Sequence, residues 1–246
     1  MKKITGILAI AALLISSTSN LQAKTSIETN SSKRRASTEN RQVSGFKGIS
    51  SSGSYDVKVT MGNTESLKIE GDEELLKEIE TVVEDGILKI RTKKHSSNWN
   101  WKKGWGKVTV YIHAKSLNNI TLSGSGNIRI EGTVKATKLT NSVSGSGNIF
   151  LNVQADEYIS NISGSGEINI GGNANKAMIK VSGSGSFAGK SFSADIADVK
   201  VSGSGNVHIK ADKTLNAAVS GSGNIRYSGN PQVSKTKSGS GNISRM

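Results

Sequence analysis

Val143-Ser-Gly-Ser-Gly-Asn-Ile149 is one copy of a motif that recurs along the second half of this chain of 246 residues. The tetrapeptide Ser-Gly-Ser-Gly occurs seven times, at intervals of 21, 19, 19, 20, 18 and 18 residues. These copies hold fourteen of the 28 glycines, so the glycine excess is periodic. A repeat of this length is typical of solenoid proteins, whose units stack on one another. The motif glycines are Gly124, Gly126, Gly145, Gly147, Gly164, Gly166, Gly183, Gly185, Gly203, Gly205, Gly221, Gly223, Gly239 and Gly241.

Apolar and polar residues alternate on both sides of each motif. Ile179 and Val181 precede one copy with Lys180 between them, and Ile168 and Ile170 follow another. Alternation with a period of two residues predicts β-strands and excludes the apolar stripe of a helix. Each repeat is therefore expected to hold a strand, a turn, a second strand and a third, looser segment.

This pattern predicts an all-β fold, a parallel β-helix or β-solenoid of about seven coils. One coil cannot bury its aliphatic face alone, whereas stacked coils form a continuous core. Glycine in the turns allows a positive φ and lets the turns lie above one another without Cβ clashes. An antiparallel β-sandwich is the alternative, although its hairpins would not require the same turn sequence in every repeat. Polar side chains expected to hydrogen-bond along the stack are Asn127, Asn148, Asn206, Asn224 and Asn242, interrupted by Glu167 and Ser186.

The last repeat departs from the pattern. Lys235, Lys237 and Arg245 stand where most earlier copies carry aliphatic residues. Charged side chains would not be tolerated between two coils, whereas terminal solenoid units are expected to be polar. The stack is therefore predicted to end here.

Residues 43–117 are β-rich but less regular, and their apolar alternation continues into the regular repeats of residues 118–246. We therefore expect one solenoid domain over residues 43–246, in which the irregular part shares the core. Ser51-Ser52-Gly53-Ser54 resembles a degenerate copy of the repeat turn. Residues 72–79 predict one helical turn with Asp72 as its N-cap, and Asp85-Gly86 predicts a tight turn.

The N-terminal residues have the features of an export signal. Over residues 1–23, Lys2 and Lys3 precede an apolar run, and a small-residue cleavage site ends at Ala23. A membrane anchor is the alternative, but the run is shorter than the roughly 20 residues of a spanning helix. Residues 24–42 are polar without periodicity, which predicts a flexible leader. The chain has no cysteine, so we expect export to the periplasm, the cell surface or the medium without lipid attachment.

Four stretches stand in order before the repeats. They are Phe46-Lys-Gly-Ile49, Tyr55-Asp-Val-Lys-Val59, Ile69-Glu-Gly-Asp-Glu73 and Asp85-Gly-Ile-Leu-Lys-Ile90. With the reiterated Ser-Gly-Ser-Gly-Asn-Ile they resemble the head GIN domain family of Bacteroidetes, the head domains of autotransporter adhesins. The resemblance covers about residues 43–245 and implies an exported β-helical protein with an adhesive or surface-binding role. It implies no catalytic or ligand-binding residues.

Polysaccharide lyases and hydrolases also use β-helical scaffolds, and sugar hydrolysis usually requires two carboxylates about 5 to 9.5 Å apart. Asp156 and Asp195 share a column of the repeat. They lie two coils apart, however, at about 10 Å, with Asn175 between them. The chain has no cysteine for a thiolate zinc site or a nucleophile, and its three histidines show no ligand spacing. We therefore predict no catalytic residues, no metal and no cofactor.

One segment combines aromatic and basic residues. Residues 86–130 contain no acid, and all three tryptophans lie within residues 98–106. Indoles on a basic loop can stack on sugar rings, enter a lipid headgroup region or bind an anionic polymer. Alternatively, they fold back and cover the N-terminal end of the solenoid. The predicted contact residues are Trp99, Trp101, Trp105, Lys93, Lys94, Lys102 and Lys103.

The chain has 32 basic and 19 acidic side chains and a net charge of +13. This charge is dispersed on a fold without a nucleic-acid-binding motif, which argues against nucleic acid as a partner. Anionic polymers are still attracted to a basic surface. We expect a non-enzymatic binding or adhesion protein of the bacterial envelope that contacts envelope or host glycans or other anionic polymers, with no transmembrane segment after signal removal. The alternatives are a polysaccharide-acting enzyme and a purely structural periplasmic protein.

Overall fold

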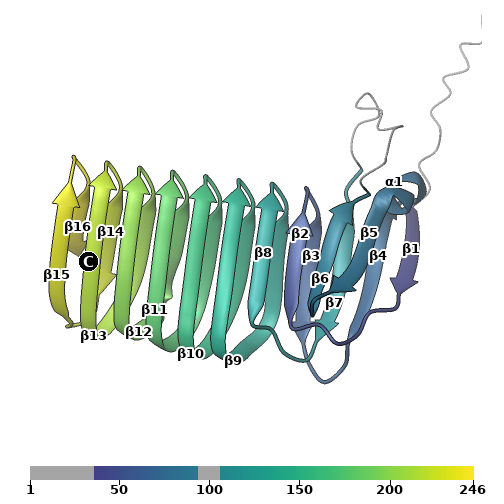
Figure 1. The fold of residues 1–246 in the computed structure, drawn as a ribbon, viewed down its shortest axis with the longest axis horizontal. Coiled ribbons are helices and arrows are strands. Elements are labelled where there is room, and N and C mark those ends of the chain that lie inside the picture. The colour runs from purple at the N-terminus through teal and green to yellow at the C-terminus, as the bar shows by residue number, and fades with distance from the viewer. Residues whose placement is uncertain (1–35, 94–105) are drawn as a thin grey trace, which may run out of the picture. The chain divides into compact units, whose positions relative to one another are not determined.

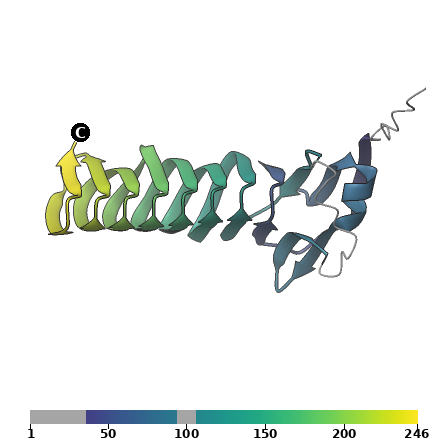
Figure 2. The same cartoon turned by 90° about the horizontal axis from the view of Figure 1, so that it is seen from above.

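The computed structural model describes residues 36–93 and 106–246, which form a parallel β-solenoid (Figure 1). Strands β9 to β13 are 16 to 19 residues long and pair with one another in parallel, as predicted for a solenoid and unlike an antiparallel sandwich. Each coil descends from one Ser-Gly-Ser-Gly turn, bends at the opposite edge and returns to the next turn (Figures 1 and 2). The strands are β9 (Asn127–Gly145), β10 (Asn148–Gly164), β11 (Glu167–Gly183), β12 (Ser186–Gly203), β13 (Asn206–Gly221), β14 (Asn224–Ser228), β15 (Gln232–Ser238) and β16 (Asn242–Arg245).

The less regular N-terminal part adds strands to the same stack. Its elements are β1 (Ala36–Arg41), β2 (Gly48–Ser52), β3 (Asp56–Met61), β4 (Ser66–Asp72), α1 (Glu73–Glu78), β5 (Ile79–Glu84), β6 (Ile87–Thr92), β7 (Thr109–Ala114) and β8 (Asn119–Gly124). The turn between β2 and β3 is the degenerate copy predicted from the sequence. Its Gly53 carbonyl accepts a hydrogen bond of 3.1 Å from the Gly126 amide of the next turn.

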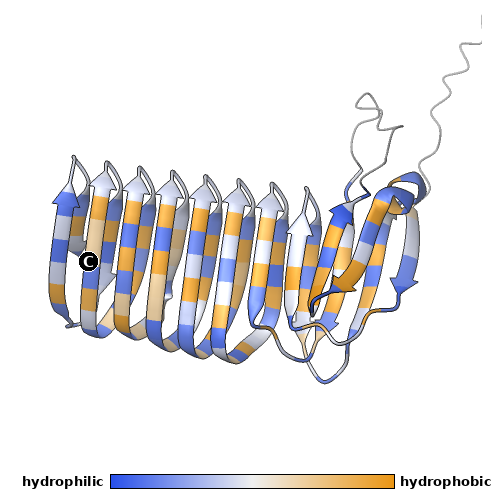
Figure 3. Cartoon of the chain, viewed as in Figure 1, coloured by the Kyte–Doolittle hydropathy of each residue, from blue (hydrophilic) through white to orange (hydrophobic). Residues whose placement is uncertain are grey.

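Every coil has two walls. Wall A contains β1, β4, β7, β3, the first halves of β9 to β13, then β14 and β16, in that order. Wall B contains β5, β6, β2, β8, the second halves of β9 to β13, and β15. Inward-facing residues of both walls form one core that extends from Phe46 to Ile243. Figure 3 shows the resulting alternation of hydrophobic and hydrophilic residues along each strand. The irregular part therefore shares the core of the regular repeats, as predicted.

The third segment of each repeat differs from the prediction. Instead of a looser connection, the long strands continue around the bend, with register shifts such as that between Phe150 and Asn152. Because successive coils have similar lengths, the backbone hydrogen bonds between their strands continue through the bend. A short register shift is enough to accommodate the difference in length. The predicted turn at Asp85-Gly86 joins antiparallel β5 and β6, with φ values of 54° and 72°.

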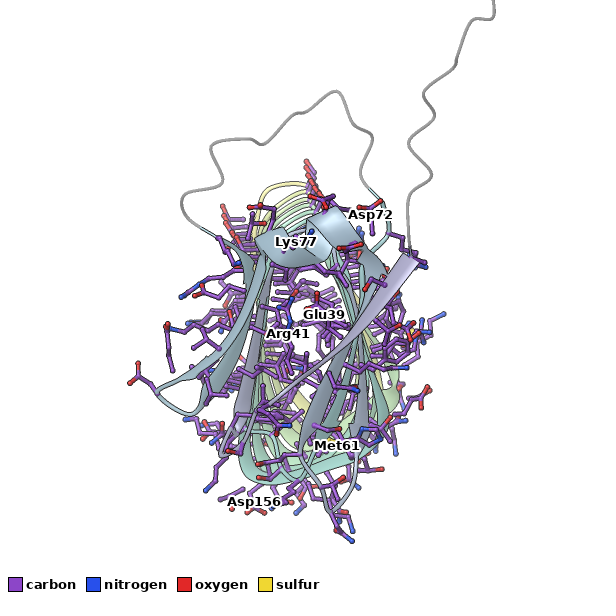
Figure 4. The ribbon with its side chains drawn as sticks, turned by 90° about the vertical axis from the view of Figure 1, so that its right-hand side faces the viewer. Glu39, Arg41, Met61, Asp72, Lys77 and Asp156 are labelled. Carbon is purple, nitrogen blue, oxygen red and sulfur yellow. The ribbon has the colours of Figure 1, made fainter. Side chains whose placement is uncertain are left out.

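The N-terminal end of the core is covered by β1 and α1. β1 lies within the segment predicted to be a flexible leader, so that prediction was wrong for residues 36–41. They pair antiparallel with β4. From β1, Arg41 reaches between the walls and donates to the carbonyls of Leu76 at 2.8 Å and Ile79 at 2.7 Å (Figure 4). The predicted N-cap is present, because Asp72 Oδ1 accepts from the Glu74 amide at 3.0 Å.

The C-terminal end is polar, as predicted. Lys235, Lys237 and Arg245 are exposed on the last coil. Lys235 extends over the Tyr227 ring and donates to the carbonyl of Ile243 at 3.2 Å. This contact joins β15 to β16 and places a cation at the open edge of both walls, which opposes the addition of another chain. No helix in the described part of the chain is both long and apolar enough to cross a membrane.

Candidate binding face

The edge that carries the Ser-Gly-Ser-Gly turns is built on two glycine columns. The first glycine of each motif has a positive φ, from 103° at Gly239 to 117° at Gly124. A Cβ on Gly145 would lie 2.6 Å from the carbonyl oxygen of Gly124 below it. The second glycine is buried, and a Cβ on Gly147 would lie 2.4 Å from the Gly126 oxygen. The motif glycines therefore allow the turns to stack, and the serine hydroxyls remain on an uncharged outer edge.

Beside this edge, wall A carries part of the predicted polar ladder, because side-chain hydrogen bonds join Asn127 to Asn148 and Asn206 to Asn224 but do not reach Asn242. The Asn148 amide donates to Asn127 Oδ1 at 3.0 Å, and Asn127 donates in turn to Asp56 Oδ1 at 2.9 Å. Asn224 donates to Asn206 in the same way at 3.1 Å. The hydrogen bond from Asn127, and after it the contact with Lys107, holds the pKa of the Asp56 carboxyl below its ordinary value. The ladder begins on β3, one coil before the first regular repeat.

The next outward-facing column of wall A gathers cations and aromatic rings. Cross-strand pairs join Lys68 to Tyr111, Tyr111 to Lys58, Lys58 to Arg129 and Arg129 to Phe150. These side chains come from β4, β7, β3, β9 and β10, which lie next to one another although their sequence order differs. We call these five residues the basic-aromatic row.

Within the basic-aromatic row, each ring lies beside at least one cation. The Tyr111 ring has Lys68 Nζ at 4.4 Å and Lys58 Nζ at 5.3 Å from its centroid. The guanidinium carbon of Arg129 is 4.2 Å from the Phe150 centroid. Both rings are half-buried, while Lys58 and Arg129 are exposed. Two aromatic rings and three positive charges therefore lie together on the outer surface of wall A.

The charges of the row are only partly neutralised. Lys68 forms a salt bridge of 2.8 Å with Glu70. This contact lowers the pKa of the Glu70 carboxyl, and the Glu70 carboxylate raises the pKa of the Tyr111 hydroxyl. Among the described residues, neither Lys58 nor Arg129 forms a salt bridge. These two cations are available to an anionic ligand.

Most of the predicted contact segment lies outside the described residues. This applies to Trp99, Trp101, Trp105, Lys94, Lys102 and Lys103. The remaining predicted contact residue, Lys93, donates from its ammonium to the Lys77 carbonyl, and from its backbone amide to the Glu78 carbonyl at 2.9 Å. Lys93 thus joins β6 to the C-terminal end of α1. The sequence prediction did not include any of the five residues of the basic-aromatic row as contact residues.

The opposite edge, where the coils bend, contains a polar groove of about 440 Å³. It is lined in part by Asp156, Asp195 and Asp212. Asp156 accepts from Asn175 at 3.1 Å, and Asp195 pairs with Lys213 at 2.8 Å. Each of these two carboxylates already has a hydrogen-bonded or charged partner. The described residues contain no group of three or more His, Asp or Glu side chains suited to a metal ion.

Comparison with known proteins places this fold in a family. The model of the family described as "Putative auto-transporter adhesin, head GIN domain" matches residues 45–231. The chain belongs to this family. Among solved structures, this head GIN domain is similar to a "putative adhesin" from Bacteroides fragilis, with a TM-score of 0.78 and 24% identity over 87% of this chain and 98% of that one.

Two structures from Parabacteroides distasonis are also similar to this head GIN domain. One, described as a "putative lipid binding protein", has 29% identity and a TM-score of 0.71. The other, a "putative adhesin", has 25% identity and a TM-score of 0.70. Each comparison covers 87% of this chain and 98% of the other. A comparison with curated proteins gives no significant match.

Proposed function

We propose that this protein is an exported, non-enzymatic adhesion protein that binds anionic glycans of the bacterial envelope or a host through the basic-aromatic row. The observation that carries the proposal is that cations lie beside half-buried rings at one register of wall A. The names of the family and of a similar solved structure from Parabacteroides distasonis agree with an adhesive role.

The chemistry of the row fits an acidic sugar. The half-buried rings of Tyr111 and Phe150 offer apolar area that a sugar can contact beside the cations. Lys58 and Arg129 have no carboxylate partner among the described residues, so a ligand carboxylate or sulfate would gain charge-assisted hydrogen bonds with them. Arg129 is also suited to bidentate contact with such a group. A neutral glycan would use the rings alone and bind more weakly.

The tryptophans at positions 99, 101 and 105 are a second proposed contact, argued from their clustering with lysines in the sequence. Because the segment follows Lys93 and ends next to Gly106, it is joined to β6 and leads to β7. Changing Trp99, Trp101 and Trp105 to alanine together tests this contact separately. Undiminished glycan binding by that variant would contradict it.

The test is a glycan array with acidic and neutral sugars, probed with the exported chain and with a Lys58→Ser/Arg129→Ser variant. We expect binding to acidic glycans that the variant loses. A matched control, Lys180→Ser/Lys200→Ser, removes two positive charges from exposed positions of wall B and should bind as the parent does. Absence of acidic-glycan binding, or equal binding by both variants, would overturn the proposal.

Two further arms separate other functions. Vesicles with anionic headgroups test the lipid binding suggested by the name of one relative. Stronger binding to vesicles than to every acidic glycan would replace the glycan proposal. Release of sugar fragments from an envelope polysaccharide would show an enzyme.

A further inference from the structure

A second group of cations lies on wall A, nearer the C-terminus. Cross-strand pairs join Ala188 to His208 and His208 to Arg226, in the column that also contains the basic-aromatic row. Lys190 lies at the bend that ends this part of β12 and is exposed, as is Arg226. We call Lys190, His208 and Arg226 the distal cluster.

Arg226 lies opposite His208 on the next strand, and Lys190 follows Gly189, which pairs with Ile209 next to His208. Burial, followed by the charges of Lys190 and Arg226, holds the pKa of His208 below its ordinary value. Among the described residues neither Lys190 nor Arg226 forms a salt bridge, whereas the neighbouring Lys210 pairs with Asp212 at 3.2 Å. The distal cluster therefore resembles the row in having two unpaired cations.

The surface between the two groups has no cation. Going from Arg129 to Arg226, the column passes Phe150, Asn169, Ala188 and His208. Five strand spacings of about 4.8 Å separate the two arginines, or about 24 Å. In the adjacent polar ladder the only carboxylate over this stretch is Glu167, which pairs with Asn148 and Ser186. A chain laid across the strands would meet positive charge at both ends and small or uncharged side chains between them.

We infer that wall A binds one linear polyanionic glycan across its strands, with the basic-aromatic row and the distal cluster holding the same chain at two points. This inference rests on the proposed function and adds the class of ligand, a linear chain long enough to span both groups. Once one group holds the chain, the second binds at an effective concentration set by the glycan, so affinity rises with length beyond the sum of the two contacts.

The experiment measures binding of galacturonate oligomers of increasing length by calorimetry at low salt. We expect weak binding of short oligomers. Once the oligomer exceeds about 24 Å, affinity should rise by about 10-fold to 100-fold. Lys190→Ser/Arg226→Ser should remove this rise, so that long oligomers bind about as weakly as short ones. Glu167→Gln removes the carboxylate beside the path and should strengthen binding of long oligomers only.

Three double variants distinguish the outcomes. If Lys58→Ser/Arg129→Ser binds short oligomers as well as the parent does, the proposed function fails. If that variant loses binding but Lys190→Ser/Arg226→Ser keeps the full gain with length, the row binds glycans and the two-point inference is overturned. Lys180→Ser/Lys200→Ser on wall B serves as the charge-matched control and should keep both the short-oligomer affinity and the gain. Loss of the gain in this control would attribute it to net charge and would also overturn the inference.

Discussion

The guanidinium of Arg41 donates to the carbonyl of Leu76 across the N-terminal end of the core, at 2.8 Å. It also contacts Ile79, Thr81 and Glu39. Arg41 therefore links wall A to α1 and to the first strand of wall B where no further coil covers the core. The side chain is 20% exposed, so its charge is only partly hydrated. Capping of an open solenoid end by a polar unit is a general need of such folds.

Arg41→Met should destabilise the protein by about 2–3 kcal/mol, because the backbone carbonyls of α1 and β5 lose a charged donor. Chemical denaturation measures the effect. Arg245→Met on the exposed last strand is the control and should change the free energy of unfolding by less than about 0.5 kcal/mol. Equal effects of the two substitutions would show that Arg41 does not stabilise the N-terminal end.

The regular coils were predictable because the motif fixes their register. Ile128 and Ile149 stand at the same distance after their motifs and are paired in the structure. The N-terminal part was less predictable, since β1, β4 and β7 join through antiparallel or non-sequential pairs that no local pattern specifies. The polarity of residues 36–41 predicted a leader. In the structure these residues form an edge strand in which every second residue is half-buried. Such a strand needs few apolar residues, because the hydrogen bonds of Arg41 hold it to the rest of the domain.

Part of the candidate site could have been predicted from the repeat. Arg129, Phe150, His208 and Arg226 all stand six residues after the first serine of their motifs, and Lys58 stands six residues after Ser52 of the degenerate turn. Aligning the repeats would have placed these five residues in one column. The remaining members, Lys68 and Tyr111, come from strands outside the repeat, and only the fold brings them together.

Gly164→Ala tests the glycine column of the turns. The residue has a φ of 109°, and its Cβ would lie 2.6 Å from the Gly145 oxygen. We expect a loss of about 1–3 kcal/mol from backbone strain, with further loss from overlap. Ser165→Ala in the same turn is exposed and should have almost no effect. If alanine at position 164 were as well tolerated as at 165, the stacked turn would have to differ from the geometry described here.

Tyr158→Phe tests a polar contact inside the core. The Tyr158 hydroxyl accepts from Asn141 Nδ2 at 3.1 Å, and both residues are fully buried. Phenylalanine would leave the amide without this partner, which should cost about 1–3 kcal/mol in the free energy of unfolding. The double variant Asn141→Leu/Tyr158→Phe should recover most of this loss, because it removes both polar groups. A double variant less stable than either single one would contradict this account.

Phe150→Ala tests the contribution of the ring to binding. The ring is half-buried and lies 4.2 Å from the Arg129 guanidinium carbon. Losing the stacking surface and the cation–π contact, worth about 0.5–1 kcal/mol, should weaken acidic-glycan binding by about 2-fold to 5-fold. Phe150→Tyr keeps the ring and should retain the affinity. Equal binding by the alanine and tyrosine variants would restrict the site to its charges.

His208 should make stability depend on pH. Because its folded-state pKa lies below the ordinary value of 6.5, the unfolded chain binds more protons between the two pKa values. The contribution of His208 to stability is therefore complete above about pH 6.5 and is lost as the pH falls through the folded-state pKa. Denaturation at pH 7.5 and pH 5 should show a smaller loss on acidification for His208→Gln than for the parent. A pH dependence that is the same in both proteins would contradict the prediction.

The same group reports whether a polyanion reaches the distal cluster. A carboxylate held by Lys190 and Arg226 would favour the charged imidazolium of His208, so long galacturonate oligomers should raise the pKa of His208 towards or above its ordinary value. By linkage, binding takes up a proton, and affinity for long oligomers increases as the pH falls from 7.5 to 5.5, while the galacturonate carboxylates remain ionised. NMR titration of the His208 ring with and without oligomer measures this shift directly. Short oligomers should leave the titration unchanged if they occupy the basic-aromatic row alone, and an unchanged titration with long oligomers would show that the glycan does not extend to His208.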